Sequence, residues 1–492
     1  MRRVQAGLLC AVLWGMGCET TKDADEGGPG GETPEESPLE LFKSGSRIKV
    51  RGVTTSDGLR WVERLHDSQR QADCSWEKAA PDGAVYCVSH EGLFNLPGPG
   101  SRGDYYFDAS CTEGLRVHFG PLPSGAVLTK HIACGELPRF HAPGERVTTT
   151  PYSLDLNTGA CLPRALSSGD VAYRAGAEVS AGTLFVRGQV TQKWSGSGFT
   201  LRFVDGEDGS SSIHRIQDTA RDTECSIERA SDQKLRCLPS GHSTAVSFGG
   251  LRMNTNATCT EEAVGISCDT PRFATITSES RCNPTTATYA IGAEVTQVYA
   301  RYGNTCERST AVPSDWRFFS PGKELPAATW LEAQERDFKT YGRLKVRGAE
   351  LGAVLQLPRE LHDTQLGTAC GFQPDVEGTP RCFPLTEASV TKGNAGHYAD
   401  AACTRPLART PNQPCTPPRF AHQYDDTTGP QPGNRIYALG ATHAGDIYVW
   451  VQSRPDAPAE CVRGERQSGT TYSVLGDEVP AKSLVAGTKR ID

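Results

Sequence analysis

Three aspartates, each seven positions before a cysteine, are the first residues in this chain whose spacing suggests acid–base or ligand chemistry. They are Asp67, Asp218 and Asp363, in the segments LHDSQRQADC, IQDTARDTEC and LHDTQLGTAC. His66 and His362 precede two of them, whereas Gln217 stands at that place in the middle copy. Adjacent side chains on a strand point to opposite faces, so a histidine and the aspartate beside it do not easily converge on one atom. We therefore predict that each aspartate caps a turn between two strands.

Eighteen cysteines form the second chemical feature of the chain. Cys10 and Cys18 lie in the N-terminal segment, and the sixteen others make an even number. No C-x-x-C pair occurs, so the spacing does not favour a zinc site, and no metal or other cofactor is expected. In an exported chain such cysteines form disulfides, because the compartment is oxidising.

The first two cysteines of each copy are separated by 12 or 13 positions, which suits a disulfide across a β-hairpin. A loop of that length contributes roughly 3 kcal/mol in the chain-entropy model. We predict the pairs Cys74–Cys87, Cys225–Cys237 and Cys370–Cys382, and then Cys111–Cys134, Cys259–Cys268 and Cys403–Cys415. Cys306 is the candidate partner of Cys282, and Cys161 and Cys461 are left without an assigned partner.

An arginine between Pro and Phe also recurs three times, as Arg139, Arg272 and Arg419. If the copies surround one axis, the three guanidinium groups would converge and bind a carboxylate, sulfate or phosphate through forked hydrogen bonds. The alternative is that each arginine pairs with an acid or carbonyl of its own copy, while the following phenylalanine packs in the core. The residues favour this local alternative.

These features recur because the chain contains three copies of one unit, whose aspartates are 151 and 145 positions apart. Each copy opens with an alternating segment typical of a half-buried strand. The segments are RIKVRG (Arg47–Gly52), LRFVDG (Leu201–Gly206) and RLKVRG (Arg343–Gly348), and the predicted repeats span 47–191, 192–340 and 341–492. The helical signal is confined to AATWLEAQERDF (Ala327–Phe338), between the second and third copies.

Short apolar runs separated by Gly, Pro, Asn, Asp and Ser predict an all-β chain of many short strands. Two segments, RIYALGATHAGDIYVWV (Arg435–Val451) and YAIGAEVTQVYARY (Tyr289–Tyr302), resemble kelch-type propeller blades, in which one strand ends in Gly and a second runs back. The resemblance implies that the three repeats close into a β-propeller-like ring, which would hide the edge strands. Three small β domains in tandem are the alternative.

The N-terminal residues predict export. A basic pair precedes the apolar run Val4–Gly17, which is too short to span a bilayer and suits a signal peptide. Cys18 ends the sequence GMGC, which resembles a bacterial lipobox although Gly15 stands where Leu is usual. Residues 1–18 are therefore predicted to be a lipoprotein signal peptide with Cys18 lipidated, and a plain secretion signal is the alternative. Residues 19–46, rich in Gly, Pro and Glu, are expected to be an acidic flexible tether.

The lipobox-like Cys18, the acid-to-cysteine hairpins and the closing motif YSVLGDEV occur together in this chain. In these features the whole chain resembles the secreted, cysteine-rich repeat lipoproteins of predatory soil myxobacteria. The resemblance implies anchoring in the bacterial envelope, with the outer membrane as the expected site, and it implies no known chemistry.

Charge and motifs restrict the function further. The net charge of −7 lies mostly in the tether, so the repeats have no strongly basic balance, and nucleic-acid binding is not expected. No G-x-S-x-G, H-E-x-x-H or P-loop motif occurs, and DGEDG (Asp205–Gly209) is interpreted as a turn rather than an ion site. We expect a binding or scaffold module, attached to the membrane by its lipid, with an envelope glycan or protein as partner. A propeller-type glycan-active hydrolase, which needs paired carboxylates, and a purely structural role are the alternatives.

Overall fold

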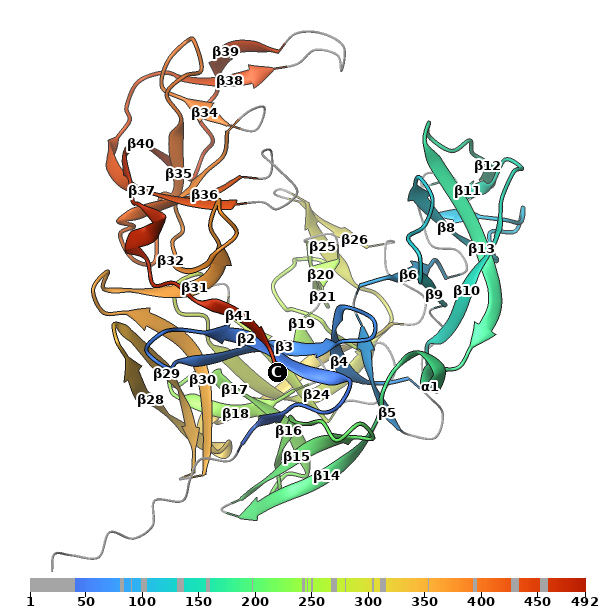
Figure 1. The fold of residues 1–492 in the computed structure, drawn as a ribbon. Coiled ribbons are helices and arrows are strands. Elements are labelled where there is room, and N and C mark those ends of the chain that lie inside the picture. Colours follow the sequence, from blue (N-terminus) through green and yellow to red (C-terminus); the bar gives the residue numbers. More distant parts are fainter. Residues whose placement is uncertain are drawn as a thin grey trace, which may run out of the picture. The chain divides into compact units, whose positions relative to one another are not determined.

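The computed structural model describes residues 40–79, 84–89, 91–98, 104–130, 137–155, 160–196, 198–240, 244–245, 247–248, 251–266, 272–278, 280–302, 305–309, 316–352, 354–392, 396–425, 433–451 and 459–492. The predicted signal peptide, with Cys18, and most of the predicted tether lie outside the described residues. The described part is all-β, as predicted (Figure 1). Its helical content is α1 (Ala181–Leu184) and the 3-10 turns Ala327–Thr329 and Ala481–Ser483.

The largest sheet contains three successive groups of antiparallel strands, here called core groups 1, 2 and 3. Core group 1 consists of β41 (Thr488–Ile491), β2 (Ile48–Thr54), β3 (Arg60–Asp67), β4 (Ala72–Lys78) and β5 (Val85–Ser89). Core group 2 consists of β14 (Arg187–Gly196), β15 (Phe199–Gly206), β16 (Ser211–Asp218), β17 (Thr223–Arg229) and β18 (Leu235–Pro239). Core group 3 consists of β28 (Glu332–Tyr341), β29 (Leu344–Leu351), β30 (Leu355–Asp363), β31 (Thr368–Pro374) and β32 (Pro380–Pro384). The short strand β1 (Phe42–Lys43) pairs with β16, so the predicted tether 19–46 extends too far, and its last residues belong to the β region.

Each core group has an apolar face and a polar face, because its strands alternate in the way the sequence predicts. In β2, Ile48 and Val50 are buried, and the intervening Lys49 and Arg51 are less so. The apolar faces pack between neighbouring groups. One cluster joins Phe203 of group 2 to Leu351 of group 3, and others join group 1 to groups 2 and 3.

The same hydrogen bond connects successive core groups. The backbone N–H of Cys87 donates to the carbonyl of Val186 at 3.0 Å, and that of Cys237 donates to Leu331 at 2.9 Å. At the equivalent place in group 3, the N–H of Cys382 donates to Val485 at 2.9 Å, just before β41. The last strand of each group therefore meets the segment that leads into another group's first strand.

A smaller sheet region follows each core group in the chain, and we call these regions arms 1, 2 and 3 (Figure 1). Arm 1 contains β6 (Leu93–Leu96), β7 (Tyr105–Tyr106), β8 (Gly114–Phe119), β9 (Val127–Lys130), β10 (Arg139–Arg146), β11 (Tyr152–Leu154), β12 (Cys161–Pro163) and β13 (Asp170–Val179). Arm 2 contains β19 (Thr244–Ala245), β20 (Ser247–Phe248), β21 (Leu251–Asn254), β22 (Val264–Ile266), β23 (Phe273–Thr277), β24 (Thr286–Val295), β25 (Tyr299–Tyr302), β26 (Thr305–Arg308) and β27 (Arg317–Leu325). Arm 3 contains β33 (Ser389–Val390), β34 (His397–Tyr398), β35 (Leu407–Pro411), β36 (Phe420–Asp425), β37 (Gly433–Thr442), β38 (Ile447–Val451), β39 (Glu460–Gly464) and β40 (Thr470–Glu478). Arms 2 and 3 each include a closed five-stranded barrel.

The helix predicted over Ala327–Phe338 is wrong. Only a 3-10 turn forms at its start, and β28 begins at Glu332. Trp330 and Ala333 are buried, and Ala333 pairs with Leu235 of β18. Pairing with the preceding core group thus outweighs the local preference of this segment for helix.

The predicted opening strands are confirmed as β2, β15 and β29, but the second is aligned differently from the prediction. A β-bulge follows an arginine on the polar face of each strand, at Arg51, Arg202 and Arg347. Because Arg202 is thus equivalent to Arg51, residues 198–203, rather than the predicted Leu201–Gly206, correspond to RIKVRG. The apolar alternation of this strand fits both alignments, so the pattern did not distinguish them.

The two kelch-like segments do not form the predicted blade hairpins. In the segment Arg435–Val451, β37 pairs with β36 and β40, whereas β38 pairs with β34 and β39. In the segment Tyr289–Tyr302, β24 and β25 likewise pair into different sheets. The glycine of each segment therefore does not belong to a tight turn between paired strands.

Candidate functional site

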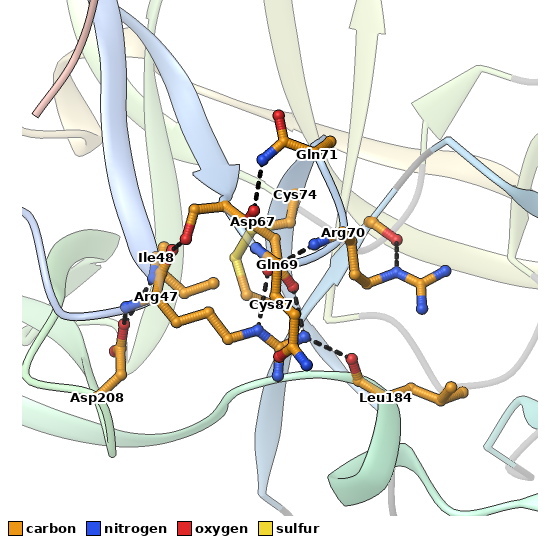
Figure 2. A network of polar contacts seen from close by, with 12 residues as sticks. Arg47, Ile48, Asp67, Gln69, Arg70, Gln71, Cys74, Cys87, Leu184 and Asp208 are labelled. Carbon is orange, nitrogen blue, oxygen red and sulfur yellow. Dashed lines mark hydrogen bonds and ion pairs between the residues drawn. A yellow bond between two sulfur atoms is a disulfide. The ribbon is translucent and has the colours of Figure 1, made fainter. Parts of the chain in front are cut away.

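Asp67 lies at the centre of a network of polar contacts (Figure 2). Its side chain is completely buried, and its Oδ1 accepts the backbone N–H groups of Gln69 and Arg70 at 3.0 and 3.2 Å. Arg47 donates from Nε to Oδ1 at 2.8 Å and from Nη2 to Oδ2 at 2.7 Å. The same guanidinium donates to the carbonyl of Leu184 at 2.7 Å, so the pair fixes α1 against core group 1.

The two equivalent aspartates confirm the predicted turn. Asp218 and Asp363 are also completely buried, and each Oδ1 accepts backbone N–H groups two and three residues further on. Arg343 pairs with Asp363 and donates to the carbonyl of Ser483 at 2.9 Å, repeating the contacts of Arg47. In core group 2 the arginine comes from within the turn, because Arg221 pairs with Asp218 at 2.8 Å. The three aspartates are therefore structural, and their buried charges have fixed partners.

A second buried pair, His66 and Asp73, lies on the polar face of core group 1. The Nδ1 atom of His66 is 3.2 Å from Oδ1 of Asp73, and Arg51 forms an ion pair with Asp73 at 2.8 Å. Sequence reasoning considered His66 with its neighbour Asp67 and missed Asp73. The signal that would have identified it is the hairpin register, since His66 and Asp73 are directly opposite each other in β3 and β4.

Three of the predicted cysteine pairs are confirmed as disulfides. The three hairpin pairs Cys74–Cys87, Cys225–Cys237 and Cys370–Cys382 are present, each across two adjacent strands. The pairs predicted for Cys111, Cys259 and Cys403 are wrong. Their observed bonds are Cys111–Cys161, Cys259–Cys306 and Cys403–Cys461. The candidate pair Cys282–Cys306 is wrong as well, because Cys282 is bonded to Cys415. Cys134 and Cys268 lie outside the described residues.

The physical reason for this error is that each arm brings a late strand beside an early turn. The bonded cysteines of the arms are 50, 47 and 58 residues apart, and the later ones lie on β12, β26 and β39. A preference for short loops therefore selected the wrong partner for each. The Cα atoms of each pair are 5.8 Å apart in all three arms, so the three bonds have one geometry.

Each of these disulfides fixes a turn that we call the arm tip. The tips are residues Asp108–Thr112, Asn256–Thr260 and Asp400–Thr404. In each tip the first residue accepts backbone N–H groups through its side chain, as Asp108 does from Ser110 and Thr112 and Asp400 does from Thr404. Cys111, Cys259 and Cys403 have φ angles of 53°, 51° and 50°, a left-handed conformation that is uncommon for residues other than glycine.

Local hydrogen bonds also lower the pKa of the capping aspartate in two of the three tips. The backbone N–H of Glu113, together with donors from Thr112 and Ser110, lowers the pKa of Asp108 below its ordinary value. In arm 3 the hydroxyl of Thr404, together with the N–H groups of Arg405 and Thr404, lowers the pKa of Asp400 in the same way. Arm 2 has the neutral Asn256 at this place.

The three arginines predicted as an anion site each have a local partner. Arg139 is 3.7 Å from Glu178, and Arg272 and Arg419 donate to the carbonyls of Asp222 and Leu366. Among the described residues, no hydrogen bond or ion pair connects one of these arginines to another. Phe140, which follows Arg139, is buried, and Phe273 and Phe420 pack against apolar clusters. These contacts agree with the local alternative.

The DGEDG segment forms the turn between β15 and β16. Asp208 accepts the backbone N–H groups of Arg47 and Ile48 through Oδ2, at 2.9 and 2.6 Å, and that of Ser210 through Oδ1. Its oxygens thus hold the start of β2 against core group 2 (Figure 2). Within the described ranges, no group of three or more His, Cys, Asp or Glu side chains is arranged to hold a metal ion.

Comparison with known proteins places most of this architecture in one family. A family model described as a family of unknown function (DUF7481) matches residues 154–461, which is more than half of the chain. The chain belongs to this family. The match begins in β11 of arm 1 and ends at Cys461, so it includes core groups 2 and 3 and arm 2 entirely. No curated protein and no solved structure matches the chain.

The seven disulfides of the described residues indicate an oxidising environment outside the cytoplasm. In the described part of the chain, no helix is both long and apolar enough to cross a membrane.

Proposed function

We propose that this protein is an exported binding module that presents three equivalent arm tips to a partner in the bacterial envelope. The observation that supports the proposal most strongly is the repeated tip geometry. A left-handed conformation costs a residue with a side chain of order 1–3 kcal/mol and persists where the surrounding structure enforces it. Here a disulfide and an Asp or Asn cap enforce it three times.

The exposed residues of the tips support a contact role. The second residue of each tip is an exposed alanine, Ala109, Ala257 or Ala401, between the capping residue and the constrained cysteine. A small side chain there leaves the turn backbone accessible to a partner. Three rigid copies on one chain increase apparent affinity when the partner also repeats, as the glycans and proteins of an envelope do.

We also propose that the core groups close into a propeller-like ring that carries the arms. The repeated hydrogen bonds of Cys87, Cys237 and Cys382 support closure, because each group meets the next through the same contact. Pairing of β41 with β2 supports it further, since that strand comes from the C-terminal segment and completes core group 1. Three independent domains in tandem would not need these shared pairings.

The lipid anchor on Cys18 and the acidic tether belong to the same proposal. The GMGC sequence and the likeness to myxobacterial repeat lipoproteins support lipidation and an outer-membrane location. A tether that begins at Glu19 and ends before β1 would hold the β region away from the membrane surface. The expected partner is an envelope glycan or another envelope protein, with no role for nucleic acid.

The proposal is tested with the chain from Glu19, which lacks the predicted signal peptide and lipidated cysteine. Isolated bacterial envelopes, and separate panels of neutral and anionic envelope glycans, are incubated with it, and both bound protein and released sugar ends are measured. Saturable binding without released product supports a binding module. Released product that increases with protein concentration supports the glycan hydrolase instead, and absence of both activities contradicts the binding proposal.

A further inference from the structure

Two arginines lie directly opposite each other on the polar faces of core groups 1 and 2. Arg51 pairs in register with Arg64, and Arg202 pairs in register with Arg215. Like charges directly opposite across two strands are destabilising. Core group 3 avoids this cost, because the residue opposite Arg347 is Glu360.

In core group 1, two carboxylates neutralise the opposed arginines Arg51 and Arg64. The buried Asp73 is 2.8 Å from Arg51 and 3.8 Å from Arg64, and Glu63, the bulge residue between them, is 3.9 Å from Arg51. Arg51 and Arg64 therefore each have a carboxylate of the protein as a partner.

In core group 3, carboxylates neutralise Arg347. Arg347 is 3.1 Å from Asp337 on β28 and 3.7 Å from Glu360 on β30. Acids on both neighbouring strands thus surround it.

Core group 2 compensates Arg215 with an acid but has no such partner for Arg202 among the described residues. Glu224 is 3.1 Å from Arg215, but among the described residues no hydrogen bond or ion pair reaches the guanidinium of Arg202. The strand neighbour of Arg202 on the other side is Gln192, at the place where core group 3 has Asp337. The bulge residue is His214 instead of an acid, and Arg215 donates to its Nε2 at 3.4 Å.

The surroundings of His214 show that positive charge accumulates on this face. Burial lowers the pKa of His214 first, and Arg215, Arg202 and Lys78 lower it further against the opposing effect of Glu224. A half-buried arginine without a counter-ion, placed against a second arginine, is an arrangement that an added oxyanion would stabilise.

We propose that Arg202 and Arg215 of core group 2 bind an oxyanion of the phosphate or sulfate type. Forked guanidinium donors on adjacent strands suit an anion with several equivalent oxygens. The site is in the core group and is independent of the arm tips, so it goes beyond the proposed binding function. Its chemistry is shared by free inorganic phosphate and by a phosphate ester on an envelope sugar.

The test is calorimetric titration of the chain from Glu19 with inorganic phosphate, with sulfate and with glucose 6-phosphate, at ionic strength held constant with chloride. The variant is Arg202→Gln, and the matched control is Arg347→Gln, which removes the equivalent arginine of core group 3. Wild type and the control are expected to bind with similar affinity, and Arg202→Gln to bind at least tenfold more weakly. Tighter binding of the ester than of inorganic phosphate would identify a phosphorylated glycan as the source, and the reverse order would identify the free ion.

A second readout separates binding from folding. Without added anion, Arg202→Gln relieves the repulsion with Arg215 and is expected to raise the melting temperature, whereas Arg347→Gln loses two ion pairs and is expected to lower it. Addition of phosphate should stabilise wild type more than Arg202→Gln. Equal phosphate affinity of wild type and Arg202→Gln, or no phosphate or sulfate binding by folded wild type at tens of millimolar, would overturn the proposal.

Discussion

Cys282 of arm 2 is bonded to Cys415 of arm 3, although 133 residues separate them in the chain. Beside this bond, Arg281 forms an ion pair with Glu387 at 2.7 Å, and the other carboxylate oxygen of Glu387 accepts the backbone N–H of Cys415 at 2.8 Å. A covalent bond and an ion pair thus connect two arms that are otherwise built from separate strands. Cys282 has no counterpart in the other two copies, so this link breaks the threefold pattern.

Replacing both cysteines of this link, Cys282→Ser with Cys415→Ser, is expected to lower the free energy of unfolding by up to about 4 kcal/mol, because the bond closes a long loop. Urea unfolding measures the change. Cys111→Ser with Cys161→Ser, which opens a 50-residue loop, is the matched control and should have a smaller effect confined to arm 1. Non-reducing peptide mapping that joins Cys415 to another cysteine would contradict the link itself.

Asp363→Asn is expected to destabilise the protein by about 3 kcal/mol. The substitution keeps an oxygen for the turn but leaves the Arg343 guanidinium without its buried counter-charge. Asp446→Asn, which removes one partner of the exposed Arg463–Asp446 pair, should cost less than about 1 kcal/mol. Similar losses of unfolding free energy in both variants, measured by chemical unfolding, would show that the buried ion pair contributes no more to stability than the exposed one.

Acid should weaken the tips of arms 1 and 3 before that of arm 2. The pKa of Asp108 and of Asp400 is lower in the folded protein than in the unfolded chain, so each contributes stability that is lost as the pH falls below the ordinary aspartate value. Asp108→Asn with Asp400→Asn is expected to make stability less dependent on pH between about 4 and 2. Asn256→Asp should increase that dependence. Hydrogen exchange of the backbone amides in the tips, measured as a function of pH, detects both effects.

Arm 3 should also lose stability in mild acid through His397. Burial, with a smaller effect of Arg409, lowers the pKa of His397, whose ring lies 5.2 Å from that of Tyr472. The unfolded chain therefore binds a proton more readily, and stability present above the ordinary histidine pKa of about 6.5 is lost as the pH falls below it. His397→Phe keeps the ring contact and is expected to remove the part of this loss that comes from His397. The part that comes from His422, whose pKa burial also lowers, should remain. An unchanged pH profile of arm 3 exchange would refute the assignment.

Contacts that are local in the chain were predictable from sequence. The turn capped by Asp67 and its equivalents uses backbone groups two and three residues away, and the hairpin disulfides join cysteines 12 or 13 residues apart. Period-two alternation identified the strands, because one face of each core group is buried. The all-β class followed from these signals together.

Contacts that depend on the arrangement of strands were not predictable in the same way. Cys161 belongs beside Cys111 only because β12 returns to the arm tip, and neither spacing nor composition encodes that return. Arg47 also donates a hydrogen bond to the carbonyl of Leu184, which is 137 residues away in the chain. The uncompensated charge of Arg202 becomes visible only when the strand registers of the three core groups are compared.

Blocking the arm tips one at a time shows whether they form the surface that binds the envelope partner. The substitutions are Ala109→Arg, Ala257→Arg and Ala401→Arg, introduced singly, in pairs and together. Binding of each variant to isolated envelopes is measured. The control variant carries Ala177→Arg and Ala293→Arg, at exposed strand positions outside the tips. Apparent affinity is expected to fall with each blocked tip, by about tenfold or more overall, while the control binds like wild type. Unchanged binding by the folded triple variant would contradict the claim that the arm tips form the binding surface.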